Sequence, residues 1–490
     1  MEHKLNDQEI NKRNKLQRLQ TENKDPFVIT KFQRNFNTAS FKTAFEKFSK
    51  EELHENNSSI LLAGRIMAIR QTFGVIKDFY GQVQFYINKK KHEEVFNIFS
   101  KDIDIGDIVG VEGTPMKTNT GEITININKI TLLSKSLKPL PEKWHGLQDE
   151  ELRARHRYID LIMNEESMKT FVTRSLILKE VRNYMDGLGY LEVETPVLHP
   201  ILGGAAAKPF ITHHNALDRN YYLRVATELP LKQLIVGGFE KVYEIGRIFR
   251  NEGMDATHNP EFTTIEAYEA FISMWEVMEL IEGIFKHIAT KLNKLKITYK
   301  EKEIDFTQPF KRINMLDFIK EKTNIDFNQM SDAEAIKLAK ERKIELKAHE
   351  ITKGHVINLF FEHYCEHECI QPTFVYGHPI EVSPLAKKNP KDPRYTDRFE
   401  LFIVGKEFAN AFSELNDPID QLERFKQQLS ERKLGNEEAN EIDHNFVEAL
   451  EYGMPPTGGL GIGIDRVVML FTNQEVIRNV LLFPHMKDEK

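Results

Sequence analysis

The chain has 490 residues, with 67 basic and 74 acidic side chains and a formal net charge of -7 at pH 7. This length predicts about two to four domains with buried cores, and the negative balance excludes the strongly basic proteins that coat nucleic acids. The only cysteines, Cys365 and Cys369, exclude a disulfide framework. Because the N-terminus is polar and no long apolar run occurs, we expect a cytoplasmic protein without a signal peptide or a membrane span.

The first 58 residues predict a helical extension ahead of the first domain. Residues 1–24 carry many charges and no Phe, Tyr or Trp, and their apolar residues are too sparse to cover a core. This composition favours a solvated helix that extends from the body of the protein. The alternative is a helix that also contacts RNA phosphates through four basic side chains: Lys12, Arg13, Lys15 and Arg18.

Residues 59–137 change to short β-rich runs, separated by glycine turns and by one helical segment, HEEVFNIF. A count of about five strands with a helix in the middle predicts a small all-β barrel of the oligonucleotide-binding (OB) type. Such barrels stack single-stranded bases on exposed aromatic rings. Phe73 and Phe85 are the candidates, and a buried position in the barrel core is the alternative for both.

A linker is predicted over residues 138–160, because two prolines near its start precede a charged helical segment. The second domain is predicted over residues 161–490. Helical patterns there alternate irregularly with hairpin-like strand pairs, which favours an antiparallel sheet with flanking helices and an α+β fold. No GxGxxG follows a strand and no GxxxxGK[ST] occurs. A doubly wound nucleotide-binding fold is therefore not expected.

The first group of candidate functional residues lies on a predicted hairpin over residues 242–271. Two strand-like runs flank the polar loop NEGMDATHNP, so Arg250 ends the first strand. Three polar residues follow in the loop: Glu252, His258 and Asn259. The period of two places four residues of the return strand on one face: Phe262, Thr264, Glu266 and Tyr268. A guanidinium, an imidazole and an aromatic ring together suit a nucleotide, although a surface hairpin with incidental charges is the alternative.

The second group lies on a predicted hairpin over residues 398–415. If Gly405 and Lys406 form a two-residue turn, Glu400 and Glu407 face the same side and offer the oxygen ligands that magnesium bound to phosphates requires. Three further polar or aromatic residues have the opposite parity to Glu407: Asn410, Phe412 and Glu414. They reach the same side only if a bulge falls between Glu407 and Asn410. A half-buried hairpin with outward acids is the alternative.

The third group is PPTGGLGIGIDRVVMLF, residues 455–471. Glycines alternate with apolar residues and then give way to a helical pattern, which predicts a strand that leads into a helix with Arg466 in its first turn. A backbone with so few side chains allows a flat base to approach closely. Packing of the glycines against another helix is the alternative.

These groups, together with one further segment, resemble the three signature motifs of class II aminoacyl-tRNA synthetases. Motif 1 is similar to GYLEVETPVL (189–198), motif 2 to FRNEG…HNPEFTTIE and motif 3 to GLGIGIDR. The runs GGAAAKPF, HGLQDEELRARHRYIDL, EVSPLAK and FSELNDP resemble the bacterial-type lysyl-tRNA synthetases in particular, with similarity from about residue 7 to residue 484. The resemblance implies a homodimer, a class II antiparallel sheet with flanking helices, and an N-terminal OB-fold barrel that binds the anticodon.

The resemblance also implies a ligase that activates L-lysine with ATP to lysyl-adenylate, releases pyrophosphate, and transfers lysine to the 3′ end of tRNA-Lys. Arg250 would bind the ATP α-phosphate and Arg466 the γ-phosphate, both as catalytic residues, while Phe262 would stack on adenine. The whole ATP set is Arg250, Glu252, His258, Asn259, Phe262, Glu400 and Arg466. Glu400 and Glu407 would hold magnesium, with more than one ion per subunit.

The matching lysine-binding positions are Gly204, Glu228, Glu266, Tyr268, Asn410, Phe412 and Glu414. Glu228 and Glu266 would pair the ε-ammonium group once it is desolvated. The matching anticodon positions are Arg70, Phe73 and Gln84, although the run over residues 64–73 is shorter than is usual in the family. Ala411 and His378 stand where many relatives carry glycine and tyrosine, and we expect them to alter the fit of the pocket.

Three other functions remain open from the sequence. An aspartyl- or asparaginyl-type synthetase shares the barrel and the three motifs, but its pocket would require a cation where Glu228 and Glu266 stand. A non-catalytic tRNA-binding regulator on the same fold would not need Arg250, Glu400, Glu407 and Arg466. An enzyme that transfers lysine to a protein would not need the N-terminal barrel.

Overall fold

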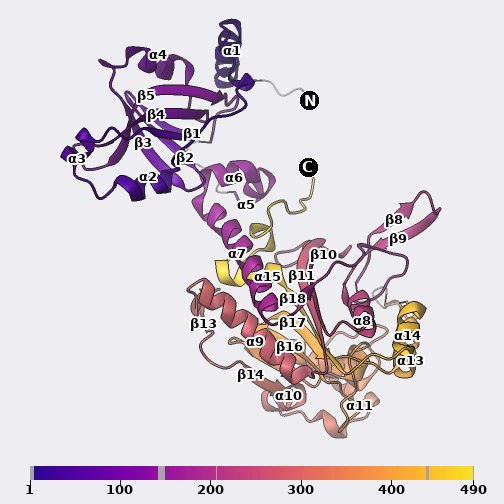
Figure 1. Ribbon diagram of the computed structural model, residues 1–490. Coiled ribbons are helices and arrows are strands. Elements are labelled where there is room, and N and C mark those ends of the chain that lie inside the picture. Colours follow the sequence, from indigo (N-terminus) through magenta and orange to yellow (C-terminus); the bar gives the residue numbers. More distant parts are fainter. Residues whose placement is uncertain (1–4, 142–148, 206, 437–440, 489–490) are drawn as a thin grey trace. The chain divides into compact units, whose positions relative to one another are not determined.

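The computed structural model describes residues 5–141, 149–205, 207–436 and 441–488. The chain divides into two compact units, Met1–Gln148 and Asp149–Lys490 (Figure 1). The first contains a β-barrel and the second contains a mostly antiparallel sheet with flanking helices, so the predicted α+β class is confirmed. No helix among the described residues is long and apolar enough to cross a membrane.

The N-terminal extension begins with helix α1 (Asp7–Thr21), which is docked on the barrel and is not freely solvated. Leu19 is only 3 % exposed. Three basic side chains of α1 bind the barrel: Lys12 contacts the Ile105 carbonyl, Lys15 pairs with Asp104, and Arg18 pairs with Asp102. The predicted helix is present and most of its residues are exposed, but one side of it is docked, and three of the four basic residues considered for RNA contacts have protein partners.

The barrel of the first unit is closed, with strand order β1-β2-β3-β5-β4, which confirms the predicted five-stranded OB fold. Its strands are β1 (Ile60–Arg70), β2 (Phe73–Asp78), β3 (Gly81–Ile87), β4 (Ile108–Lys117) and β5 (Ile123–Ser134). Helix α4 (Glu93–Asp102) connects β3 to β4, and the short segments η1 (Pro26–Val28), α2 (Thr38–Phe45) and α3 (Lys50–Glu55) precede the barrel. Apolar side chains that alternate along the strands fill the interior.

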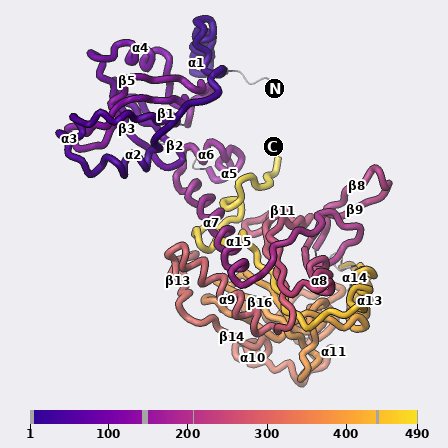
Figure 2. The backbone as a smooth tube through the Cα atoms, viewed as in Figure 1, coloured from indigo at the N-terminus to yellow at the C-terminus, as the bar shows by residue number. Residues whose placement is uncertain are grey.

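The second unit begins with α5 (Glu150–Arg155), α6 (Arg157–Met163) and α7 (Glu165–Gly187). Arg157 is 2 % exposed, and its guanidinium donates to the carbonyls of Arg478 and Leu482 near the C-terminus. Figure 2 shows this C-terminal segment beside the first helices of the unit. Residues 149–160 of the predicted linker thus belong to the second unit, and residues 142–148 of it lie outside the described residues.

The main sheet of the second unit has eight strands in the order β14-β15-β16-β17-β18-β11-β10-β6. Their bounds are β6 (Leu191–Glu192), β10 (Lys241–Phe249), β11 (Glu261–Ala270), β14 (Lys311–Asn314), β15 (Thr373–Tyr376), β16 (Arg398–Ile403), β17 (Lys406–Ser413) and β18 (Thr457–Gly463). The pairs β10–β6 and β14–β15 are parallel, and the other pairs are antiparallel. This order brings the three predicted groups of candidate residues, on β10–β11, β16–β17 and β18, side by side in one sheet.

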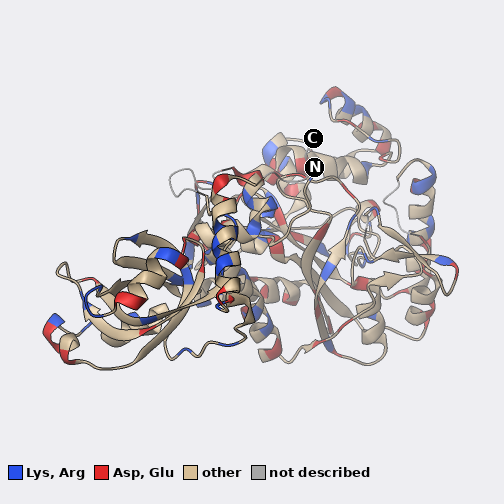
Figure 3. Ribbon diagram, turned by 90° about the horizontal axis from the view of Figure 1, so that it is seen from above, with Lys and Arg blue, Asp and Glu red and all other residues tan. Residues whose placement is uncertain are grey.

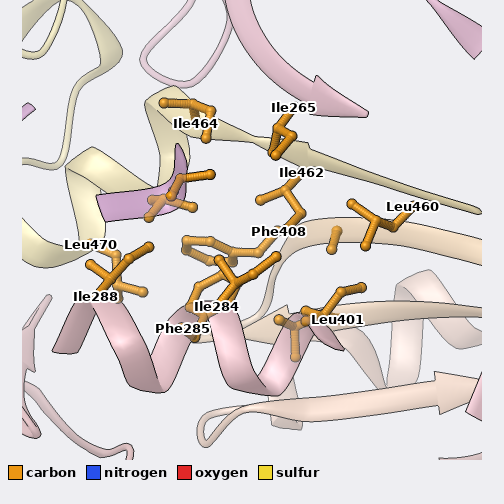
Figure 4. Packing of buried hydrophobic residues seen from close by; sticks show 14 of the residues in the cluster. Ile265, Ile284, Phe285, Ile288, Leu401, Phe408, Leu460, Ile462, Ile464 and Leu470 are labelled. Carbon is orange, nitrogen blue, oxygen red and sulfur yellow. The ribbon is translucent and has the colours of Figure 1, made fainter. Parts of the chain in front are cut away.

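One face of this sheet packs on α7, α9 (Met274–Lys291) and α15 (Ile464–Thr472). Figure 4 shows the contact, in which Ile265, Phe408 and Ile462 of the sheet meet Ile284 and Phe285 of α9. Burial of this many apolar side chains is the main favourable contribution to folding, at roughly 25 cal/mol per Å² of apolar surface. The residues between them, by the period of two, face the opposite side of the sheet.

Smaller elements complete the second unit. They are α8 (Glu228–Val236), α10 (Met315–Thr323), α11 (Asp332–Glu341), α12 (Lys353–Tyr364), α13 (Pro418–Lys433) and α14 (His444–Glu451), with the small sheet β7 (Leu198–His199), β8 (Ile211–His214) and β9 (Arg219–Leu223) and the hairpin β12 (Lys296–Tyr299) and β13 (Lys302–Asp305). Figure 3 shows acidic and basic residues interspersed along the helices and strands. A charged binding site is therefore formed by a local cluster of side chains and not by a surface of one sign.

The turn between β16 and β17 lies one residue earlier in the chain than predicted. Ile403 pairs with Lys406, so the turn is formed by Val404 and Gly405, both with positive φ, and not by Gly405 and Lys406. The predicted bulge is confirmed, because Phe408 has no cross-strand partner in the register. Phe408 joins the core, and the bulge leaves Glu407 on the open face of the sheet together with Asn410 and Phe412.

Candidate active site

A cleft of 710 Å³ lies over the open face of the main sheet. Its floor is formed by β11, β17 and β18, and its walls include the loop after β10 and parts of α8, α12 and α13. All the residues predicted from the sequence to bind the nucleotide, the amino acid or magnesium line it: Gly204, Glu228, Arg250, Glu252, His258, Asn259, Phe262, Glu266, Tyr268, Glu400, Glu407, Asn410, Phe412, Glu414 and Arg466. Five separate chain segments therefore converge on one site.

The glycines of β18 form part of the cleft floor. Gly461 lies opposite Glu266 and Gly459 lies opposite Tyr268 in the β11–β18 register. A Cβ atom on Gly459 would stand 2.0 Å from a Glu414 carboxylate oxygen, so that glycine is required by packing. A Cβ atom on Gly461 would meet nothing closer than 3.8 Å, so that glycine leaves open space above the sheet. Packing against a helix, the alternative considered for these glycines, occurs at Gly458, where a Cβ atom would stand 2.5 Å from Val277 of α9.

One end of the cleft contains three carboxylates, those of Glu228, Glu266 and Glu414. Glu266 is 8 % exposed, and its carboxylate accepts hydrogen bonds from the Thr227 backbone amide at 3.0 Å and from the Tyr268 hydroxyl at 3.2 Å. Burial, together with the nearby charge of Glu228, raises the pKa of Glu266 to about 7. This end of the cleft is therefore prepared to receive a cation.

Lys232 was not singled out from the sequence, and it lies directly behind this end of the cleft. It follows Glu228 by one turn of α8, and its ammonium is 2.5 Å from the Glu228 carboxylate and also pairs with Glu414. Its side chain has no solvent exposure. Among the described residues, Glu266 is the only one of the three carboxylates that has no basic partner. Glu–Lys pairs at i,i+4 are common on exposed helices. The spacing of Glu228 and Lys232 in the sequence therefore did not indicate a buried ion pair.

The opposite end of the cleft contains Arg250 and Arg466. The Arg250 guanidinium lies 5.2 Å from the centroid of the Phe262 ring, and its buried Nε atom has no hydrogen-bond partner among the described residues. A buried donor without an acceptor is costly, which points to an anionic ligand here. Arg466 donates to the Glu407 backbone carbonyl at 2.5 Å and lies 3.6 Å from the Glu407 carboxylate.

The loop after β10 is held in shape by Asp255. Its carboxylate accepts hydrogen bonds from the backbone amides of Thr257 and His258, and it lies 2.8 Å from the His258 Nδ1 atom. Against the effect of burial, these bonds lower the pKa of Asp255. Asn259 donates to the Glu261 carbonyl and accepts from the His485 backbone amide, so its side chain ties the loop to the C-terminal segment.

Glu400 and Glu407 are suited to a divalent cation. Both line the cleft, and burial together with repulsion from Glu400 raises the pKa of Glu407, even though 44 % of the Glu407 side chain reaches the cleft solvent. No group of three or more His, Cys, Asp or Glu side chains within the described ranges could hold a metal by itself. Two carboxylates fit Mg²⁺, which commonly takes its other ligands from water and from substrate phosphates.

Arg398 is a second residue that the sequence did not reveal. Its guanidinium donates to Glu400 at 2.6 Å and to the Asn410 side chain at 2.9 Å, and also to the Val382 carbonyl. Arg398 therefore fixes two cleft residues on neighbouring strands. A basic residue at the start of a strand is common, and only the register of β16 with β17 places it between the two.

Two residues that were expected to alter the fit of the pocket, Ala411 and His378, lie outside the cleft lining. Ala411 is completely buried in the core on the helix-covered face of the sheet. His378 is also buried, and burial and the nearby charge of Arg398 lower its pKa well below the usual value, so it is neutral. Neither side chain lines the cleft. Any effect of these two residues on the fit of the pocket would therefore be indirect, through the residues packed on them.

The predicted anticodon residues lie together on the barrel of the first unit. Arg70 pairs with Phe73 across β1 and β2, and Phe73 pairs with Tyr86 across β2 and β3, two residues from Gln84. Opposite residues of an antiparallel pair share a face, so all of them project from the outer surface of the barrel. Phe85 is fully buried against Phe99 and is excluded as a stacking residue.

Comparison with known families identifies both units. Residues 149–487 match the family described as tRNA synthetases class II (D, K and N), and residues 60–133 match the OB-fold nucleic acid binding domain. The chain is 61 % identical to a lysine–tRNA ligase of Malacoplasma penetrans and 58 % identical to one of Ureaplasma urealyticum, each over 100 % of both chains. It is 57 % identical to a lysine–tRNA ligase of Streptococcus sanguinis, over 99 % of this chain and 98 % of that one.

The raised pKa of Glu266 predicts a pH-dependent cost to stability. In the unfolded chain this carboxyl ionises near its ordinary value of 4.5, whereas in the folded protein it keeps its proton up to about 7. Stability is therefore lost as pH rises between these values, by about 3 kcal/mol in full. Urea unfolding should show Glu266→Gln to be more stable than the unmodified protein at pH 8, with a much smaller difference at pH 4.5.

The control for this measurement is Glu279→Gln, which changes an exposed carboxyl on α9. Surface changes of this kind typically stay within about 0.5 kcal/mol. A Glu266→Gln effect that is equal at both pH values would contradict the assignment.

Proposed function

The chain belongs to the lysine–tRNA ligases of the class II synthetase family, and from this premise we propose how its residues carry out the reaction. The enzyme activates L-lysine with ATP to lysyl-adenylate, releases pyrophosphate, and transfers lysine to tRNA-Lys. The observation that carries the mechanism is the polarity of the cleft, with uncompensated carboxylate at one end and an unpartnered guanidinium nitrogen at the other. An amino acid with a basic side chain fits the carboxylate end, and a nucleoside triphosphate fits the end with the guanidinium group.

Lysine binds at the carboxylate end in this proposal. Glu266, assisted by the Tyr268 hydroxyl, receives the ε-ammonium group, and Glu228 offers the second acceptor. A desolvated ammonium must be paired and hydrogen-bonded, and a buried Glu266 without a basic partner supplies that pairing. Lysine binding then requires the ionised form of Glu266, so an empty site near neutral pH releases a proton when it takes up lysine.

ATP binds at the other end. Phe262 stacks on adenine, Glu252, His258 and Asn259 border the nucleotide, and Arg250 and Arg466 bind the α- and γ-phosphates. The unpartnered Nε atom of Arg250 supports the phosphate assignment. The lysine carboxylate attacks the α-phosphorus atom, and the bond to pyrophosphate breaks. Alignment of the two substrates and neutralisation of phosphate charge by both arginines provide most of the acceleration.

Glu400 and Glu407 are the residues that would hold magnesium, and we expect more than one ion per subunit. Bound magnesium supplies neutralisation of phosphate charge in this site. Arg398 holds the Glu400 carboxylate in place, and Arg466 lies against Glu407. These two ion pairs keep both carboxylates on the cleft face before any ligand arrives.

In the second step the 3′-terminal hydroxyl of tRNA attacks the carbonyl carbon of lysyl-adenylate, and AMP leaves. The anticodon end of the same tRNA contacts the first unit, where Arg70, Phe73 and Gln84 share the outer barrel surface. Phe73 stacks on an anticodon base in this proposal. Such stacking is sequence-tolerant, so neighbouring polar groups must select the base.

Lys232 bears on the competing aspartyl or asparaginyl function. A pocket for a substrate carboxylate needs an available cation, and Lys232 stands close to the correct place. Its ammonium, however, is buried and shared between Glu228 and Glu414, so it is not available to a substrate. The structure therefore favours lysine over aspartate on charge alone.

The decisive test of the function is ATP–pyrophosphate exchange with each of the twenty amino acids, in the presence of magnesium and the absence of tRNA. Exchange with lysine alone would support the activation chemistry and the pocket assignment together. Exchange with aspartate or asparagine would reject the roles of Glu228 and Glu266. No exchange with any amino acid would favour a non-catalytic regulator.

We also propose a cytoplasmic homodimer. Cys365 and Cys369 are free, buried thiols, which suits a reducing compartment. Several apolar side chains around the segment that resembles motif 1 are exposed in the single chain: Val172, Leu176, Leu188, Leu191, Val197 and Leu198. An apolar surface of this kind is typical of an interface between two copies related by a two-fold axis.

The dimer can be tested by sedimentation. Leu191→Asp places a charge in the proposed interface, and we expect it to convert the dimer to a monomer. Ile419→Asp is the matched control, because Ile419 is 77 % exposed on α13, away from that segment, and it should leave the dimer unchanged. A fully active monomeric wild-type enzyme would contradict the proposal.

The role of Glu266 predicts a selective kinetic defect. Glu266→Gln removes the carboxylate that pairs the ε-ammonium, and loss of one partner of a buried charge pair costs about 3–5 kcal/mol. We expect a large increase in the KM for lysine in pyrophosphate exchange and little change in the KM for ATP. Equal loss of affinity for both substrates would reject the assignment.

The role of Phe73 predicts a defect confined to tRNA. Phe73→Ala should weaken aminoacylation by about 1–3 kcal/mol and should leave pyrophosphate exchange unchanged. Phe79→Ala is the control, because Phe79 is an exposed aromatic residue at the β2–β3 turn of the same barrel. If both variants charge tRNA as well as the wild type does, Phe73 does not stack on the anticodon.

A further inference from the structure

Lys232 is a charged side chain enclosed within the wall of the cleft and not on its surface. The side chains that line the cleft include its partners Glu228 and Glu414 but not Lys232 itself. Its ammonium also lies 5.3 Å from the centroid of the Phe412 ring and 5.9 Å from that of Phe446. A fully buried lysine costs several kcal/mol of desolvation, so its presence calls for a compensating role.

The charge count at this end of the cleft suggests that role. Glu228, Glu266 and Glu414 contribute three negative charges when they are ionised, and Lys232 contributes one positive charge. The remainder, two negative charges, equals the charge of the α- and ε-ammonium groups of lysine, whose carboxylate is directed toward the arginine end in the proposed mechanism. Without Lys232 the pocket would contain one negative charge more than the substrate neutralises, and the carboxylates would bind protons in its place.

The protonation tendencies describe the cluster before a substrate brings its positive charge. Burial alone would lower the pKa of Lys232, but the charges of Glu228 and Glu414 outweigh burial and raise it, so Lys232 remains charged. Burial raises the pKa of Glu414 well above its usual value, and the charges of Glu228 and Glu266 add to that rise. Lys232 opposes the rise, so its loss would make the empty pocket hold its protons to higher pH. Tyr268, on β11, is the remaining titratable group that faces this cluster, and burial raises its pKa well above the usual value, so it stays neutral.

We propose that Lys232 is a positioning residue that sets the charge of the lysine pocket. It holds Glu228 and Glu414 through a shared ammonium group and leaves Glu266 as the carboxylate that receives the substrate. Lys232 contacts neither substrate and acts through the two carboxylates that do. This inference rests on the proposed lysine-binding roles of Glu228, Glu266 and Glu414.

The test compares pyrophosphate exchange by Lys232→Met and Lys232→Arg over a range of pH. Met has a similar length without the charge, so the KM for lysine at pH 7 should rise about tenfold or more while the KM for ATP stays within about twofold. The rise of kcat/KM for lysine with pH should also move to higher pH, by about one unit. Lys232→Arg retains the charge and should keep the wild-type pH profile, even if its affinity for lysine is lower.

The control is Lys294→Met, which removes a partly buried ammonium group of the same unit that donates to the Phe471 carbonyl behind the core. It should alter neither the KM for lysine nor the pH profile. If Lys232→Met shows the same lysine KM and pH profile as the wild type, or if its ATP KM rises equally, the proposal is overturned. Absence of lysine-dependent exchange in the wild type would instead reject the proposed function, so the two failures are distinguishable.

Glu414→Gln gives the same test from the opposite side if Lys232→Met fails to fold. It removes one neighbouring negative charge and leaves Lys232 in place. The pH profile of kcat/KM for lysine should then move to lower pH, because Glu266 ionises more easily. A profile at the wild-type position would overturn the role of Lys232 in setting the pocket charge.

Discussion

The contact between the main sheet and helices α7, α9 and α15 constrains the rest of the catalytic unit. Ile265, Leu460, Ile462 and Ala409 must face these helices, because they are the residues that bury the apolar surface of the sheet. Strand side chains alternate, so every neighbouring residue is committed to the opposite face. The neighbouring residues include Thr264, Glu266, Asn410 and most of the β18 glycines, which therefore line the cleft on that opposite face. A slip of one residue in any strand would lose the core and the site together.

The bulge at Phe408 shows how this constraint is adjusted locally. Without it, Glu407 and Asn410 could not both lie on the cleft face, because they are separated by an odd number of positions. The additional residue enters the core as an aromatic side chain that packs on Phe285 at a ring-centroid distance of 6.2 Å. The same insertion thus strengthens the core and places the magnesium-binding candidate Glu407 in the cleft.

The two ends of the cleft differ in how their charges are compensated before any substrate binds. Arg250 and Arg466 face the nucleotide end, and one nitrogen of Arg250 has no partner among the described residues. At the lysine end, a buried ammonium group already forms ion pairs with two of the three carboxylates. Charges held in place by the fold need little rearrangement when the substrates arrive, which is the condition for effective electrostatic catalysis. The selectivity of the site for a dibasic amino acid thus depends on a residue that the substrate does not contact.

The sequence by itself determined the barrel and the α+β class, because these depend on alternation and glycine placement along single segments. The resemblance to a known family implied the fifteen candidate residues that line the cleft, including Gly204 and Glu228, which no local pattern singles out. Tertiary structure decided the rest. The turn at Val404 and Gly405 forms because their backbone amides donate to the carbonyls of Ile370 and Cys369, which outweighs the usual reluctance of a β-branched residue to adopt positive φ. The docking of α1 depends on ion pairs with Asp102 and Asp104, and the buried position of Lys232 depends on Glu414, a residue far away in the chain. Such pairings over long sequence separations leave no local pattern, so only the folded chain could reveal them.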